Sequence, residues 1–168
     1  AGTDLSNVSL KGKNLSGTIL TGADLTGEIL TGADLTGTIL TRADLSDAIL
    51  TGADLSGNDL TGTILTGADL TGTILTGADL TGAILTGADL SGYDLTGTIL
   101  TGADLTNAIL RGADLSDSNF QYAIFDNANL ENVNLYYAEF IQVDLTKIKN
   151  KSLAEADLTS TSFAYSNL

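Results

Sequence analysis

A bulky apolar residue occupies every fifth position from Leu5 to Leu145, which gives 29 consecutive units. One face of a helix recurs about every 3.6 residues and one face of a strand every two residues, so neither element keeps all of these residues inside. A coil with flat sides does so if each pentad forms one side and one corner and a whole number of pentads closes the turn. The period therefore predicts a solenoid in which equivalent leucines stack on successive turns.

The unit around this leucine often reads Ala-Asp-Leu-Thr-Gly, as in residues 23–27, and residues 103–107 read Ala-Asp-Leu-Thr-Asn. This motif resembles that of the pentapeptide repeat family, whose unit is Ala-(Asp/Asn)-Leu-x-x, and the resemblance covers nearly the whole chain. The resemblance implies an all-β fold, a right-handed quadrilateral parallel β-helix of about eight coils with four pentapeptides in each. It also implies that the leucine and the residue two positions before it point inward.

We expect a single domain over residues 1–168, with a change of register near its end. After Leu145 the leucine spacing breaks, and it resumes three residues out of phase at Leu153, Leu158, Phe163 and Leu168. The shift predicts a loop or a short helix at 146–152, followed by a C-terminal coil or cap at 153–168. A cover is needed there because an open coil end exposes unpaired strand edges and apolar core.

The predicted core is the column of inward leucines and their aromatic substitutes, represented by Leu25, Leu45, Leu65, Leu85, Leu105 and Phe125. The position two residues before each is mostly Ala or Thr, which suits a narrow corner. Gly stands two residues after the leucine in 18 pentads, and this predicts a tight turn with positive φ. The chain has no proline, which fits a continuous ladder that uses the backbone N–H groups as donors.

Acidic residues are the clearest functional signal. Between Asp24 and Asp144 there are 18 acidic and 2 basic residues, a net charge of −16. Over about six coils spaced by about 4.8 Å, this is one charge per about 1.8 Å, close to the value of about 1.7 Å for duplex DNA. The candidate acidic surface consists of Asp24, Asp34, Asp44, Asp54, Asp59, Asp69, Asp79, Asp89, Asp94, Asp104 and Asp114.

The residue before each leucine alternates between Asp and Ile, and this alternation slips where two Asp pentads follow each other. Residues 56–71 recur as residues 91–106 with one difference, Asn58 in the first copy and Tyr93 in the second. Duplication of a 35-residue block accounts for the slip. Both differing residues fall at the small inward position, so we expect that the corner opens there or that the side chain turns outward.

Several classes of function are excluded by what the chain lacks. It has no histidine or cysteine, and its carboxylates are expected in outward columns rather than in a cleft, so we expect no enzyme, no cofactor and no metal site. No apolar stretch is long enough to span a membrane, and direct binding of nucleic acid is disfavoured by the charge. The compartment stays open between the cytoplasm and a periplasm or thylakoid lumen reached through a removed signal peptide.

Three functional hypotheses follow. The first is a structural or protein-interaction module, with a candidate interface for a partner or a homodimer at Tyr122, Tyr136, Tyr137 and Ile141, which we call the C-terminal patch. The second is DNA mimicry, because some proteins of the family that this chain resembles act in this way on DNA gyrase or a related topoisomerase. The third is an ice-binding array, since Thr or Ser follows nearly every leucine and stacks in columns.

Overall fold

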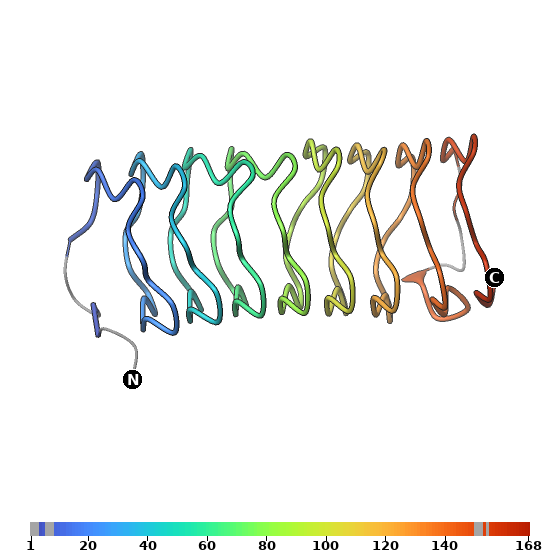
Figure 1. The fold of residues 1–168 in the computed structure, drawn as a ribbon. Coiled ribbons are helices and arrows are strands. Elements are labelled where there is room, and N and C mark those ends of the chain that lie inside the picture. The colour runs from blue at the N-terminus through green and yellow to red at the C-terminus, as the bar shows by residue number, and fades with distance from the viewer. Residues whose placement is uncertain (1–3, 6–8, 150–152, 154) are drawn as a thin grey trace.

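The computed structural model describes residues 4, 5, 9–149, 153 and 155–168. In these residues the chain winds into a rod of stacked coils, with the first described coil and the last coil at opposite tips (Figure 1). Within these residues the regular structure consists of isolated parallel β-bridges, each one residue long, at the position before the core residue. Ile19 pairs with Ile39 and Asp24 pairs with Asp44. Bridge partners are thus 20 residues, or four pentads, apart, and the fold is a parallel β-helix.

Each pentad uses its backbone in the same way. At the corner after Leu20, the Ala23 amide donates to the Leu20 carbonyl at 2.9 Å, and Gly22 between them has a φ of 62°. A positive φ at this third position is the requirement of a type II turn. Along the flat side, the Leu25 amide donates to the Asp44 carbonyl of the next coil and the Asp44 amide donates to Ala23. These hydrogen bonds join each coil to the next along the flat side.

The positive φ predicted for the corner glycines is confirmed, and it extends to other residue types. Arg42, Tyr122 and Gln142 occupy the same corner position with φ between 55° and 62°. The geometry is therefore imposed by the coil and not by the glycine. Side chains other than Gly, Asn and Asp pay a steric cost of about 1–2 kcal/mol in this region.

The core consists of columns of inward side chains, one behind each side of the rod. Leu25, Leu45, Leu65, Leu85, Leu105 and Phe125 are each at most 1% exposed. Alanines and threonines two residues before the core residue are mostly buried as well, and these small side chains leave room for the leucines. Toward the C-terminus the column becomes aromatic, with ring centroids 4.8 Å apart for Phe120 and Phe140 and 5.5 Å apart for Phe140 and Phe163.

The ladder changes register near the end of the chain. Bridge partners are 23 residues apart from the pair of Asn134 and Asp157 onward, in place of 20. The three extra residues fall after Leu145, where 146–147 form a turn and Lys149 lies in a 3₁₀ turn. Residues 150–152 and 154, on which part of the predicted loop or helix falls, lie outside the described residues. Residues 155–168 carry the last bridges of the ladder.

The bridges also show how the outward residues stack. Ile64 pairs with Ile84, but the same column carries Asp4, Asp24 and Asp44 in its first coils. The expected rotation of the Asp and Ile pattern is therefore confirmed, and no side of the rod carries isoleucine from end to end. Exposed isoleucines remain in short groups, which keeps any apolar patch small.

Candidate interaction surface

The aspartates of the candidate acidic surface all use their carboxylates in the same way. In each of the eleven, one carboxylate oxygen accepts the backbone N–H of the residue two positions later, at 2.9–3.1 Å. This is the Asx turn, in which a short polar side chain replaces a backbone acceptor. That N–H is the one amide of the pentad that neither the turn nor the ladder uses. The aspartate therefore completes the hydrogen bonding of its own corner.

The following Ser or Thr hydroxyl often donates to the same carboxylate oxygen. Ser56 donates to Asp54 at 2.7 Å, and Thr71 donates to Asp69 at 2.6 Å. These hydroxyl bonds, together with the amide bonds, hold the pKa of Asp54 and of Asp69 below the ordinary value. Both carboxylates are accordingly ionised at neutral pH, and each is held in a defined position.

Asparagine makes the same turn where it replaces aspartate. Asn119 accepts the Gln121 amide at 2.9 Å, and Asn129 accepts the Glu131 amide at 3.0 Å. Asn14 does so near the other end of the rod. The Asx turn therefore needs a side-chain oxygen but not its negative charge, and the pentads that carry Ile at this position form their corners without it.

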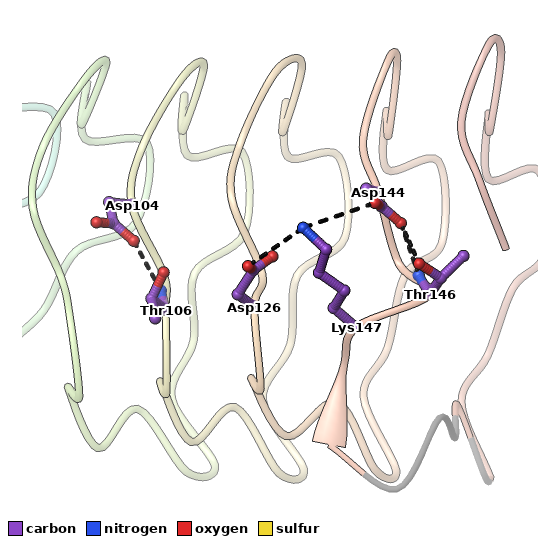
Figure 2. Close-up of polar contacts among 6 residues, drawn as sticks. All are labelled: Asp104, Thr106, Asp126, Asp144, Thr146 and Lys147. Atoms are coloured by element: carbon purple, nitrogen blue, oxygen red, sulfur yellow. Dashed lines mark hydrogen bonds and ion pairs between the residues drawn. The ribbon is translucent and has the colours of Figure 1, made fainter.

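The negative charge of the columns is not offset by neighbouring cations. Among the described residues, none of the eleven aspartates has a basic side chain within ion-pair distance, whereas Lys147 lies 3.4 Å from Asp126 and 4.0 Å from Asp144. Figure 2 shows Lys147 reaching between these two carboxylates of neighbouring coils near the C-terminal end. The central coils thus present uncompensated carboxylates to the solvent.

Threonine hydroxyls in the outward columns are directed at carboxylates. In two pentads that carry Ile, the threonine uses an aspartate of the next coil: Thr41 donates to Asp59 at 3.1 Å, and Thr51 donates to Asp69 at 3.2 Å. The neighbouring column also changes between Ile and Asp within each side. An ice-binding array requires a flat and uniform row of hydroxyls, so this arrangement argues against that hypothesis.

The C-terminal patch lies on two corners of the rod. Tyr136 and Tyr137 are adjacent, with ring centroids 4.4 Å apart in an edge-to-face arrangement. Tyr122 and Ile141 share the next corner, where the Tyr122 amide donates to the Ile141 carbonyl. The exposed Glu139 stands between the two corners. Tyr122, Tyr136 and Tyr137 are each at least 40% exposed, while Ile141 is half-buried.

Sequence reasoning missed the structural role of the aspartates, which it placed in outward columns as a candidate acidic surface. The signal that could have found it is the Ser or Thr that follows two residues after nearly every Asp, since this spacing is typical of an Asx turn. It also left open the outcome at Asn58. The Asn58 side chain is 2% exposed, donates to the Leu35 carbonyl at 2.8 Å and accepts the Gly37 amide at 3.0 Å. Asn58 therefore stays inside the corner with its polar atoms paired.

Two further findings concern the described part of the chain. It contains no group of three or more acidic, histidine or cysteine side chains placed to hold a metal ion. It also contains no helix with the length and apolar character that crossing a membrane requires.

Comparison with known proteins places the repeat in context. The family model described as "Pentapeptide repeats (8 copies)" matches residues 1–37, 29–67, 38–77, 64–102, 73–112 and 113–149. No curated protein sequence matches the chain. Among solved structures, HetL of the cyanobacterium Nostoc sp. strain PCC 7120, a pentapeptide repeat protein involved in regulating heterocyst differentiation, is 30% identical over 96% of this chain and 90% of its own, with a TM-score of 0.56.

Two structures of QnrB1, a plasmid-mediated fluoroquinolone resistance protein, are also similar. A trypsin-treated form is 18% identical over 92% of this chain and 86% of its own, with a TM-score of 0.67. The full-length form is 19% identical over 92% of this chain and 88% of its own, with a TM-score of 0.57. At this level of identity the likeness concerns the fold, a right-handed β-helix.

Proposed function

Since the chain belongs to the pentapeptide repeat family, we propose that it is a non-enzymatic protein-interaction module, a four-sided rod of about eight coils. The observation that supports this proposal is the state of the outward aspartates. Each is fixed at its own corner by an amide hydrogen bond, and none has a cationic partner among the described residues. A partner with a basic groove gains attraction from these charges without first having to order them.

The spacing of the charges points to one class of partner in particular. Successive coils lie about 4.8 Å apart, and the stretch from Asp24 to Asp144 carries about one net charge per 1.8 Å, against about 1.7 Å in duplex DNA. A protein surface that binds the DNA backbone is complementary to such a rod. As a second, narrower candidate function, the rod imitates DNA at a topoisomerase of the DNA gyrase type.

The test is inhibition of gyrase supercoiling by the purified protein across a salt series. Attraction between opposite surface charges is screened by salt, so inhibition is expected to weaken as the salt concentration rises. The variant Asp69→Asn with Asp79→Asn removes two charges from the central columns and keeps the Asx turns, as Asn119 does. We expect this variant to inhibit less than the unmodified protein while its circular dichroism is unchanged.

A matched control distinguishes recognition of the outward aspartate columns from a response to total charge alone. Asp47→Asn with Asp117→Asn also removes two charges, but at corner positions whose positive φ asparagine accepts. We call Asp69→Asn with Asp79→Asn the column variant. A loss of inhibition that occurs in the column variant but not in the control supports recognition of the outward aspartate columns. If the unmodified protein does not inhibit gyrase, the narrower candidate fails. A partner isolated by pull-down is then tested against both proteins. If it binds the column variant and the unmodified protein with equal affinity, the candidate acidic surface is not the binding surface.

A further inference from the structure

Among the described residues, one stretch in the middle of the rod loses all of its backbone hydrogen bonds between coils, whereas the stretches around Asn58 and around Asp144 lose only some of theirs. Six backbone hydrogen bonds join residues 47–55 to 66–74, and six equivalent bonds join 87–95 to 106–114. Between these, no backbone hydrogen bond joins residues 67–75 to 86–94, all of which are described. Figure 1 shows a wider interval between coils along the upper edge in this green to yellow-green region. We call this interruption the split.

The cause of the split is the side chain of Tyr93. It occupies the small inward position at which Thr73 and Thr98 fit within the corner, and its hydroxyl donates to the Leu70 carbonyl of the preceding coil. The aromatic ring is only partly buried, since the corner has no room for it. In the duplicated block the equivalent Asn58 is enclosed and the bridges on both sides of it remain, although only two of the six equivalent backbone hydrogen bonds, from the Gly32 and Leu40 amides, are kept. The substitution by tyrosine, and not the duplication, thus accounts for the complete opening.

Two coil segments border the split, 67–75 and 86–94, and we call them its lips. Both carry backbone groups without backbone partners. On one lip the amides of Gly67, Leu70 and Leu75 have no acceptor in the next coil. On the other lip the amides of Asp89 and Asp94 have no acceptor in the preceding coil. Each lip is therefore the edge of a parallel sheet, and such an edge is able to pair with an added extended strand.

The split also contains space on both sides of the Tyr93 ring. One cavity of about 290 Å³ is bordered by Leu70, Asp69 and Asp89, and another of about 500 Å³ is bordered by Ile74 and Asp94, with Tyr93 common to both. Pockets that hold small ligands have volumes of about 300–1,000 Å³. The available space therefore suits a few residues of a peptide.

The charge of the split selects what binds in it. Asp69, Asp89 and Asp94 stand around the ring, and none of them has an ion-pair partner among the described residues. Burial of the hydroxyl, with a smaller contribution from the charges of Asp69 and Asp89, raises the pKa of Tyr93. A negative field beside an aromatic face favours the side chain of lysine or arginine.

We propose that the split binds an extended basic peptide segment of another protein, whose backbone pairs with the open lips and whose cationic side chains meet these three aspartates. This mode of recognition is the addition of a strand to a sheet edge, in which main-chain hydrogen bonds give affinity and side chains give specificity. The site shares Asp69, Asp89 and Asp94 with the candidate acidic surface, but it differs from the rest of that surface because it depends on the opened ladder at Tyr93. It does not require that the rest of that surface bind a partner.

The probe for the test is a blocked hexapeptide of alternating lysine and valine. Its control is the same hexapeptide with N-methyl groups on alternate backbone amides, which keeps the charge but removes donors. We expect binding to the unmodified protein with 1:1 stoichiometry in calorimetry, and at least about tenfold weaker binding of the methylated peptide. Bound peptide is also expected to slow hydrogen exchange at the Leu70 and Leu75 amides. Equal affinity of the two peptides would show attraction by charge alone and would overturn the proposal.

A protein variant gives an independent test. Tyr93→Thr places the residue of the neighbouring corners in the split, and we expect it to close the ladder and to weaken binding of the unmethylated peptide by at least about tenfold. Asn58→Thr is the matched control at the copy whose bridges remain, and it is expected to bind as the unmodified protein does. If Tyr93→Thr folds and retains full affinity, the split is not the site. The methylated peptide decides the question even if that variant does not fold.

Discussion

The variant Tyr93→Thr is expected to make the protein more stable, although it removes a large side chain. Closing the ladder restores up to six backbone hydrogen bonds, each with a net contribution of about 0.5–1.5 kcal/mol, or about 3–9 kcal/mol in all. Against this stand the loss of a partly buried ring and of its bond to the Leu70 carbonyl, together about 2–3 kcal/mol. The balance favours the variant by about 0–7 kcal/mol, and the middle of both ranges gives about 3.5 kcal/mol.

Thermal unfolding followed by circular dichroism measures this change. A gain of 1 kcal/mol corresponds to a rise in Tm of about 2–4 °C for a chain of this size. Because a solenoid does not have to unfold in one step, hydrogen exchange provides the local measurement, and slower exchange is expected at the Leu70 and Leu75 amides. Asn58→Thr serves as the control, with little change expected at either amide. A Tm that is unchanged or lower, with exchange at these amides as fast as before, would refute the reasoning.

Three other predictions concern the core, the carboxylates and the C-terminal patch. Phe140→Ala is expected to lower the free energy of unfolding by about 3–5 kcal/mol and Phe140→Leu by less than about 1.5 kcal/mol, as measured by urea denaturation, because leucine refills the column. Hydrogen bonds from Thr71 lower the pKa of Asp69 in the folded protein, so their stabilisation is present above the unfolded pKa of about 3.9 and is lost as the pH falls through the lowered folded value. The urea midpoint should therefore be flat between about pH 6 and 8 and fall below about pH 4, and a midpoint that rises on acidification would contradict this. If the C-terminal patch mediates a homodimer, replacing its residues by Ser should convert dimer to monomer in sedimentation, whereas sedimentation as a monomer before and after the change would remove that hypothesis.

The fold was readable from the sequence because one physical requirement repeats in every unit. Burial of a leucine every five residues leaves few solutions, and the corner glycines and absent prolines agree with the same one. The ladder offset of 20 residues and the positive φ at Gly22 follow this pattern. Register shifts were also visible, since the leucines themselves move out of phase after Leu145.

The candidate sites were less readable because they depend on departures from the repeat. The sequence identifies the outward aspartates as acidic but does not show by period alone that their carboxylates complete the corners. The contrast between Asn58 and Tyr93 illustrates a second limit. Both violate the same small position, yet the amide of Asn58 fits between two backbone groups, whereas the ring of Tyr93 separates the coils. Which outcome follows depends on side-chain shape at a corner, and this is a property of the packed structure.

The Asx turn has a consequence for how such a rod is able to diversify. Because the Asx turn forms with either Asp or Asn, a single substitution alters one charge while the backbone stays the same. The net charge of this chain is therefore able to change with almost no change in its fold. A series of rods from strongly anionic to nearly neutral, all with the same shape and spacing, is accessible by exchanging carboxylates for amides one coil at a time.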